Sequence, residues 1–345
     1  MPEAPADRGA AHIARAFLGA PLDRVAVGLR EVARANGFPI EEEAQGLFLQ
    51  LRAGALRASA AGGRTALEIA APGPHGLQLL RDMLAERVSA LGLALDWETR
   101  WRGGRPANLS LARLAGRERI SPSYVRLRLE GPDLARFAVG GLHFRLLFGP
   151  EGADWPSTDA GGVTSWPGGV AAWHRPVYTT RAIETRGAAA TITCDVFLHE
   201  GGRVTEWALA ARPGAEVALT GPNGAERPEA AWMGLVGDET ALPVIARILA
   251  EAPPATRGAA VLFAPKAEDV QPLAHPAGMT VRWALRGAGE TPLDALEGLD
   301  PPGTDRFVFF AAERAEAAAA RARLPQRGLG RGEFHASGYW TAAEA

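Results

Sequence analysis

Residues 175–181 read Arg-Pro-Val-Tyr-Thr-Thr-Arg and bring two guanidinium groups, one phenol ring and two hydroxyl groups together. Because neighbouring side chains of an extended strand point to opposite faces, this run presents two chemically different surfaces. A flat aromatic ring can lie against a planar heterocycle, hydroxyl groups can bond its polar rim, and a guanidinium can hold a phosphate through paired hydrogen bonds. These are the needs of a bound flavin dinucleotide. Taken by itself, the run also suits an ordinary exposed strand with scattered arginines.

Five further sequence blocks follow this run in order. They are Cys-Asp-Val-Phe-Leu-His-Glu-Gly-Gly-Arg-Val-Thr-Glu-Trp-Ala (194–208), Arg-Pro-Gly-Ala-Glu (212–216), Gly-Pro-Asn-Gly (221–224), Leu-Val-Gly-Asp-Glu-Thr-Ala-Leu-Pro (235–243) and Gly-Tyr-Trp (338–340). From about residue 109 to residue 340, the ordered set resembles the siderophore-interacting proteins. That family is a branch of ferric-siderophore reductases within the ferredoxin–NADP reductase superfamily. An ordered set of blocks is far more specific than any one of them.

The resemblance implies a multidomain fold. An antiparallel six-stranded β-barrel that binds FAD is expected over residues 105–228, and a parallel-sheet α/β domain resembling NAD(P)H-binding domains over residues 229–345. Residues 1–100 are expected to form a small α+β domain of unknown role, similar to a bacterial domain found beside siderophore-utilisation proteins. Residues 101–106, punctuated by glycine and proline, read as a linker.

Hydrophobic spacing supports these three parts. In the first, helices are expected at residues 22–33 and 75–91 and strands at 47–51, 53–60, 65–70 and 94–98. In the second, six β-prone segments suit a closed barrel: 109–118, 124–130, 142–148, 177–181, 191–199 and 216–220. Residues 149–172 between them read as a long irregular loop. In the third, apolar strands (232–236, 259–264, 279–284 and 307–311) occur with helices (239–250 and 313–323), the pattern of a parallel sheet covered on both faces.

Composition narrows the possible partners. The chain of 345 residues carries 37 basic and 39 acidic residues, a formal charge of −2, which gives no sign of nucleic-acid binding. Cys194 is the only cysteine, which excludes an intrachain disulfide and a four-thiolate iron–sulfur cluster. No apolar run approaches the ~20 residues of a membrane span, and the first residues lack the basic and apolar regions of a secretory leader. We therefore expect a cytoplasmic protein.

The resemblance also assigns site residues. Tyr178 is assigned to the flavin ring and Thr179 to a hydrogen bond near its reactive end. Arg175 and Arg181 are candidates for the flavin phosphates or for an anionic substrate. Residues 195–199 are expected beside the ribityl or adenosine part, with a solvated strand face as the alternative. The full set of expected cofactor-binding residues is Arg175, Tyr178, Thr179, Arg181, Asp195, Phe197, Leu198, His199, Gly202, Arg203, Val204, Thr205, Asp238, Glu239, Thr240, Ala241 and Trp340.

Residues 202–205, Gly-Arg-Val-Thr, precede an expected helix over residues 206–211. A threonine at a helix N-cap, with free amides behind it, forms a site for a pyrophosphate, which is the role that the family gives this segment. The family usually has Gly-Pro-Ala-Ser here, so Arg203 and Thr205 are departures, and the added guanidinium could strengthen phosphate binding. A threonine that merely caps a helix is the alternative.

The turn at residues 237–243 has Glu239 where ferredoxin reductases have a glycine-rich approach to a pyridine nucleotide, and Thr240 is the expected helix N-cap. A bulky anion there should hinder a tight pyrophosphate fit. NADH, NADPH or reduced ferredoxin therefore stay open as electron donors.

The histidines form no short-spaced metal motif, so we expect no protein-bound metal. The expected function is an FAD-dependent ferric-siderophore reductase in which no catalytic group beyond the flavin is required and iron arrives inside its chelator. Two alternatives stay open. One is an NAD(P)H:flavin or ferredoxin-type reductase with another acceptor, and the other is a non-catalytic siderophore-binding or regulatory flavoprotein.

Overall fold

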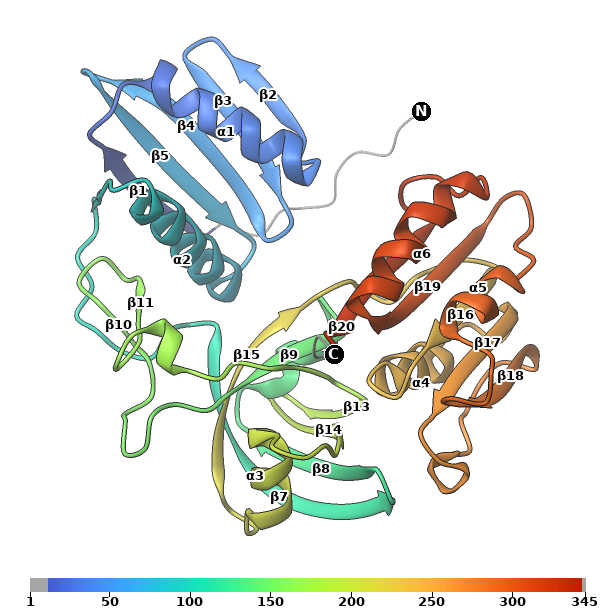
Figure 1. Ribbon diagram of the computed structural model, residues 1–345. Coiled ribbons are helices and arrows are strands. Elements are labelled where there is room, and N and C mark those ends of the chain that lie inside the picture. Colours follow the sequence, from blue (N-terminus) through green and yellow to red (C-terminus); the bar gives the residue numbers. More distant parts are fainter. Residues whose placement is uncertain (1–11, 343–345) are drawn as a thin grey trace. The chain divides into compact units, whose positions relative to one another are not determined.

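The computed structural model of the protein describes residues 12–342. Contacts divide the chain into two compact units, Met1–Ser110 with Leu147–His174 and Leu111–Leu146 with Arg175–Ala345. The first unit thus joins the N-terminal part of the chain to the expected long loop. Figure 1 shows the elements of both units. Within the described residues, no helix is both long and apolar enough to span a lipid bilayer.

The first unit is built on a six-stranded sheet with the strand order β2-β3-β4-β5-β1-β6. Its main elements are β1 (His12–Leu18), α1 (Leu22–Asn36), β2 (Ile40–Glu43), β3 (Gly46–Leu51), β4 (Gly54–Ala61), β5 (Arg64–Ala71), α2 (Pro74–Ala90) and β6 (Leu95–Trp97). The strands pair antiparallel throughout. The expected mixture of helices and strands is present, and β1 and β2 are strands that the sequence analysis missed.

Both helices of this unit pack on one face of its sheet (Figure 1). Strand alternation turns Leu47 and Leu49 of β3 and Leu56 of β4 toward that face. There they are buried in one apolar cluster with Ala33 of α1 and Leu80 of α2. This cluster is the core of the first unit.

The long loop forms a short hairpin of β10 (Ser157–Thr158) and β11 (Thr164–Ser165) that docks on α2. The carboxylate of Asp82 accepts hydrogen bonds from the Thr164 backbone N–H at 2.8 Å and from the Thr164 hydroxyl at 2.7 Å. Gln78, one turn earlier on α2, donates to the Gly162 carbonyl at 2.9 Å. The loop is therefore held by side chains of the helix.

Arg81 supplies a third contact between α2 and the loop. Its guanidinium donates to the Gly161 carbonyl and lies 4.5 Å from the centre of the Trp97 ring and 5.2 Å from that of Trp101. Only 3% of Arg81 is exposed, and this burial lowers its pKa. A buried guanidinium between two indole rings adds cation–π stabilisation to the docked loop.

Removing residues 1–105 is expected to release the loop while leaving the second unit folded. The side chains that hold the loop lie on α2, so residues 149–172 of the fragment lose these partners. Limited proteolysis with mass spectrometry should show new cleavage within 149–172 and protection of 175–340. An insoluble fragment, or a loop as protected as in the full chain, would contradict this division of the chain.

The second unit contains a seven-stranded sheet with the order β12-β9-β15-β7-β8-β14-β13. Its elements are β7 (Leu109–Ser121), β8 (Tyr124–Gly131), β9 (His143–Leu147), β12 (Val177–Thr179), β13 (Ala182–Arg186), β14 (Ala189–Phe197), α3 (Arg203–Ala210) and β15 (Glu216–Asn223). The pairs β7–β8, β8–β14, β13–β14 and β9–β12 are antiparallel. We expected six strands. The seventh, β13, was missed because its mostly exposed residues show no apolar alternation.

A five-stranded parallel sheet with the order β18-β17-β16-β19-β20 completes the second unit. Its elements are β16 (Trp232–Gly237), α4 (Leu242–Glu251), β17 (Arg257–Ala264), β18 (Gly278–Leu285), α5 (Pro292–Glu297), β19 (Arg306–Glu313), α6 (Arg314–Gln326) and β20 (Phe334–Trp340). Helix α4 is buried with Leu235 and Phe309 on one face, and α5 and α6 with Val236 and Phe310 on the other. The expected parallel sheet covered on both faces is confirmed, and β20 is an additional strand.

A buried carboxylate joins the two sheets of the second unit. Asp269, in a 3-10 turn after β17, accepts hydrogen bonds from the hydroxyls of Ser121 and Ser123 at 2.7 Å each. It also accepts one from the Ser123 backbone N–H at 2.8 Å. Nearby, the Tyr124 hydroxyl donates to the Glu239 carbonyl at 2.7 Å. The hairpin between β7 and β8 is thereby fixed to the parallel sheet.

Candidate functional site

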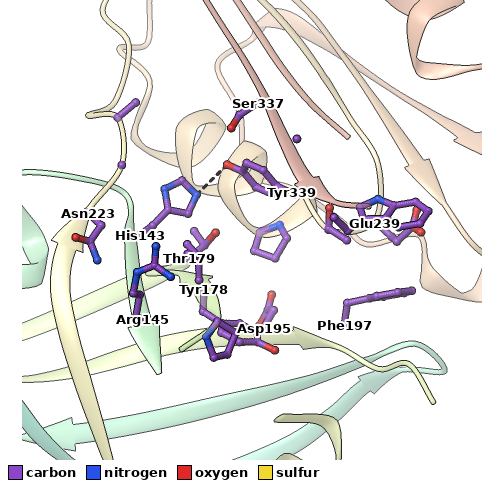
Figure 2. Close-up of a pocket in the computed structure, with 18 of the residues that line it drawn as sticks. His143, Arg145, Tyr178, Thr179, Asp195, Phe197, Asn223, Glu239, Ser337 and Tyr339 are labelled. Carbon is purple, nitrogen blue, oxygen red and sulfur yellow. Dashed lines mark hydrogen bonds between the residues drawn. The ribbon is translucent and has the colours of Figure 1, made fainter. Parts of the chain in front are cut away.

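A cavity of about 880 Å³ lies in the second unit. Strands β9, β12 and β14 and the end of β15 line one side, and the turn after β16, the start of α4 and the end of β20 line the other. In Figure 2, Tyr178, Asp195 and Phe197 come from the antiparallel sheet, Glu239 from the turn after β16, and Tyr339 from the parallel sheet. The cavity thus lies at the carboxyl edge of the parallel sheet, where open α/β sheets bind ligands.

The structure brings about half of the predicted site residues to this cavity. Those in its lining are Tyr178, Thr179, Asp195, Phe197, His199, Glu239, Thr240 and Trp340. Those outside the lining are Arg175, Arg181, Leu198, Gly202, Arg203, Val204, Thr205, Asp238 and Ala241. Several of the second group contact lining residues directly.

Strand β12 sets the flavin-motif side chains beside β9. Tyr178 pairs with Phe144, and Thr179 pairs with His143, across the antiparallel ladder. Burial raises the pKa of the Tyr178 phenol well above its usual range, so the ring is neutral at physiological pH. We expected one strand over residues 177–181, but β12 ends at Thr179, where the chain leaves β9 and then pairs with β14.

Arg145 is a lining residue that the sequence analysis missed. It lies on β9 directly opposite Val177 of the motif strand, and its guanidinium donates to the Arg175 carbonyl at 2.7 Å. Burial and the positive charge of Arg175 both lower the pKa of Arg145. The positive charge in the lining comes from this residue rather than from Arg175. Arg145 could have been predicted only from the pairing of β9 with β12.

Asp195 is a buried lining carboxylate flanked by two arginines. Its two oxygens accept hydrogen bonds from Arg126 Nε at 2.7 Å and Arg126 Nη2 at 2.8 Å. Arg181 Nε lies 3.9 Å from Asp195 Oδ2. The predicted Arg181 thus adjoins the cavity through Asp195, and Arg126 was missed because it lies 69 residues away in sequence.

Helix α3 begins earlier than predicted. Its N-cap is Gly202, so Thr205 lies in the first turn and does not cap the helix, and no side chain caps it. The Thr205 hydroxyl instead accepts a hydrogen bond from the His199 backbone N–H at 3.3 Å. Thr205 was mistaken for the cap because threonine is a common N-cap, but glycine also occurs at this position.

The turn after β16 holds a network of charges at the cavity edge. Arg286 donates to Glu239 Oε2 at 2.7 Å and lies 3.5 Å from Asp238 Oδ2. The Trp340 indole N–H donates to the same Asp238 oxygen at 2.7 Å. Burial raises the pKa of Glu239, with the charge of Asp238 adding to the effect. Among residues 12–342, no group of three or more histidine, cysteine, aspartate or glutamate side chains is placed to hold a metal ion.

Thr240 is not the N-cap of the following helix. Helix α4 starts at Leu242 with Ala241 as its N-cap, and both the Thr240 backbone N–H and its hydroxyl donate to Asp238 Oδ1, at 2.9 and 2.6 Å. The buried Asp238 carboxylate therefore organises the turn. Arg286 was missed because its part in this turn depends on β18 lying in the same sheet as β16.

A histidine–tyrosine pair crosses the cavity from the antiparallel to the parallel sheet (Figure 2). Tyr339 Oη and His143 Nε2 lie 2.9 Å apart. Burial, with smaller electrostatic contributions from His335 and Arg247, lowers the pKa of His143 to about 4. The imidazole is therefore neutral at physiological pH, and in the tautomer that carries its proton on Nδ1 the Nε2 atom accepts the hydrogen bond that the Tyr339 hydroxyl donates. Sequence reasoning missed His143 because its partner lies 196 residues away.

The neutral state of His143 predicts a loss of stability in mild acid. Because its pKa is about 4 in the folded chain and about 6.5 when unfolded, the unfolded chain binds the proton first as pH falls. The contribution is present above pH ~6.5 and is lost as pH falls toward ~4, amounting to about 2 kcal/mol between pH 7.5 and 5. Urea unfolding at both pH values should show this extra loss in the wild type relative to His143→Gln. Equal pH dependence in the two proteins would contradict it.

Two family models match consecutive parts of the chain. The one described as a siderophore-interacting FAD-binding domain matches residues 113–226, and the one described as siderophore-interacting protein matches residues 230–343. An uncharacterized protein of Mycobacterium tuberculosis is 31% identical over 195 residues, which cover 53% of this chain and 67% of that protein. The chain belongs to the siderophore-interacting protein family.

Two further relatives agree with this assignment. The ferric vibriobactin reductase ViuB of Vibrio cholerae is 28% identical over 240 residues, which cover 64% of this chain and 85% of that protein. The crystal structure of a siderophore utilization protein from T. fusca is 27% identical and superposes with a TM-score of 0.58 over 71% of this chain and 96% of that one. The likeness covers the family's two domains and leaves the N-terminal part of this chain outside it.

The cavity fits the FAD that the family description names. Its volume of about 880 Å³ falls in the range of roughly 300–1,000 Å³ typical of ligand sites. At the start of α3, a Cβ on Gly202 would lie 2.6 Å from the ring of His199 and 3.0 Å from the Thr205 hydroxyl, so glycine is needed there. His199 lines the cavity, which places the uncapped, electropositive start of α3 beside it. An aromatic ring, a hydroxyl and a helix N-terminus are the donor set of a dinucleotide site.

Proposed function

We propose that this protein is an FAD-dependent reductase that releases iron from ferric siderophores in the cytoplasm. The observation that carries the proposal is a single cavity lined by both family domains, with lining residues at 143–225 and 239–341. The relative named as a ferric vibriobactin reductase supports a ferric chelate as the substrate. The cytoplasm is the proposed location because a reductase of this kind draws its electrons from reduced cytoplasmic carriers.

We assign the cofactor contacts to residues of the antiparallel sheet. The neutral ring of Tyr178 would stack on the flavin, and the Thr179 hydroxyl would bond its polar rim. The start of α3 at Gly202 and the guanidinium of Arg181 would hold the pyrophosphate. When bound, FAD accepts two electrons as a hydride and can return them singly, which suits a one-electron acceptor.

The proposed substrate is an anionic ferric chelate. Siderophores hold Fe(III) through hard oxygen ligands, and Fe(II) is held far less tightly, so one electron per iron makes the metal exchangeable. Arg145 would attract such an anion, because among residues 12–342 its guanidinium contacts a backbone carbonyl and no carboxylate. Its charge is thus available in the cavity lining.

NADH or NADPH is the proposed electron donor, with reduced ferredoxin as the alternative. The strand order places β16 and its turn where α/β domains bind dinucleotides. The acidic turn is partly neutralised there, since Arg286 pairs with both Glu239 and Asp238. We therefore propose that the nicotinamide cofactor reaches the cavity without its pyrophosphate binding tightly in this turn.

The test uses purified protein under anaerobic conditions. Cofactor released by heat should be FAD, about one per chain, and NADPH or NADH with a ferric siderophore should yield Fe(II), trapped by a coloured Fe(II)-specific chelator. Two Fe(II) are expected for each nicotinamide oxidised, because a hydride carries two electrons. Protein that stays colourless after reconstitution with FAD, or that retains only FMN, would contradict the proposal.

The gallium siderophore is the matched control. Ga(III) has nearly the same charge and ligand geometry but cannot accept an electron under these conditions, so it should compete with the ferric form without oxidising the nicotinamide. Nicotinamide oxidation that continues with the gallium complex would favour a reductase with another acceptor. Binding of both complexes without any Fe(II) would favour a siderophore-binding protein.

A further inference from the structure

Arg126 is the residue whose guanidinium binds the carboxylate of Asp195. The two residues lie directly opposite each other on β8 and β14, and the guanidinium binds both carboxylate oxygens at 2.7 and 2.8 Å. Such a bidentate pair is the strongest form of ion pair between side chains. The side chain of Asp195 is 2% exposed, so its charge would be costly in the cavity wall without this partner.

Arg181 is a second arginine near the same carboxylate, but it forms no hydrogen bond with it. Its Nε lies 3.9 Å from Asp195 Oδ2, too far for a hydrogen bond, and its side chain is 17% exposed. Within the described residues, the guanidinium of Arg181 makes this ion pair and no hydrogen bond. Burial lowers its pKa, although an arginine stays charged.

Two cations therefore share one anion beside the cavity, and one positive charge is left in excess. If Arg126 were absent, both oxygens of Asp195 would be open, and Arg181 is the cation within reach to bind them. The carboxylate would then compete with a phosphate for Arg181, and the excess charge would be lost. Arg126 thus controls whether Arg181 can serve an outside anion.

We infer that Arg126 is a positioning residue for the cofactor: it occupies Asp195 and so keeps Arg181 available to the pyrophosphate of FAD. The inference rests on the proposed function, since it presupposes that FAD binds here. Arg126 lies outside the cavity lining and acts through Asp195. A purely structural cross-strand pair would instead affect the stability of the fold and leave cofactor affinity unchanged.

The test measures the affinity of the full-length chain, stripped of flavin, for FAD and for riboflavin by fluorescence titration. Arg126→Gln is expected to weaken FAD binding about tenfold or more, the effect of a lost charge-assisted bond, and to leave riboflavin binding within about twofold. The double variant Arg126→Gln with Asp195→Asn removes the competing charge and is expected to bind FAD more tightly than Arg126→Gln, within about threefold of Asp195→Asn alone, which is the reference for any contact that Asp195 makes with the cofactor. Arg128→Gln, on the same strand and exposed, is the matched control.

The outcomes separate the inference from the proposed function. Wild-type protein that binds no FAD would overturn both. Wild-type protein that binds FAD, with Arg126→Gln equally tight, would overturn the inference alone. The same holds if the double variant stays as weak as Arg126→Gln, or if riboflavin binding falls in parallel with FAD binding, because the effect would then be structural.

Discussion

Replacing Asp269 with alanine is expected to lower the free energy of unfolding of the second unit by about 3 kcal/mol, the upper end of the cost of leaving buried donors without their charged acceptor. The carboxylate is fully buried and accepts three hydrogen bonds from Ser121 and Ser123. Its loss leaves a buried Ser123 N–H and two hydroxyls without their acceptor. The hairpin between β7 and β8 would then lose its attachment to the parallel sheet.

Urea unfolding followed by tryptophan fluorescence measures this effect, with Glu268→Ala as the matched control. Glu268 is the exposed neighbour of Asp269, so its replacement should change stability by less than about 0.5 kcal/mol. Asp269→Asn keeps an acceptor oxygen and should fall between the two. Equal unfolding midpoints for Asp269→Ala and Glu268→Ala would show that the contact does not join the sheets.

Replacing Arg181 with alanine is expected to weaken FAD binding by about 100-fold, because a partly buried guanidinium that meets a phosphate forms charge-assisted hydrogen bonds worth roughly 1.5–3 kcal/mol. Tyr178→Ala should weaken it less, by about fivefold, since lost ring stacking is worth about 1 kcal/mol beyond the area buried. Arg175→Ala should have the smallest effect of the three. Both arginines lie outside the cavity lining, but Arg181 adjoins it through Asp195, whereas Arg175 meets the lining residue Arg145 through its backbone carbonyl, which the substitution keeps.

Titration of flavin-free protein with FAD checks this order, and Arg186→Ala at the exposed end of β13 is the control. Raising the salt concentration should weaken wild-type binding more than Arg181→Ala binding, because the variant has already lost the charge contact. An Arg181→Ala protein with wild-type affinity would remove that residue from the phosphate site. An effect of Arg175→Ala larger than that of Arg181→Ala would reverse the assignment.

The elements that the sequence predicts well are those with a strong local pattern. The apolar runs at β16, β17 and β19 specify buried parallel strands, and helices α4 and α6 follow from spacing, whereas the six-residue α5 was not predicted. Strand β20 was missed because Phe334–Trp340 mixes histidine, serine and glycine with its aromatic residues. It forms because it pairs with the edge of β19, and the sequence of the segment alone does not reveal this partner.

The residues of the candidate site also fall into two groups, those found from a local motif and those that depend on distant partners. The run at residues 175–181 and the blocks after it identify the cofactor and place Tyr178, Thr179 and Asp195 at the cavity, since each block is a local motif. Arg126, Arg145 and His143 could not be found in this way, because each acquires its role from a cross-strand neighbour or from a partner distant in the chain. Pairing of strands, which a single sequence does not specify, decides these positions.

The most direct test of a ferric-siderophore reductase is single-turnover oxidation of the reduced protein. The FAD-loaded protein is reduced by light without oxygen and then mixed with ferric siderophores in a stopped-flow instrument, with the flavin absorbance and Fe(II) recorded together. We expect the flavin to be reoxidised with two Fe(II) formed per FAD, at a rate that saturates with siderophore concentration because the chelate binds before it is reduced. Reduced protein that stays reduced with every ferric siderophore tested, yet is reoxidised by oxygen, would contradict the account.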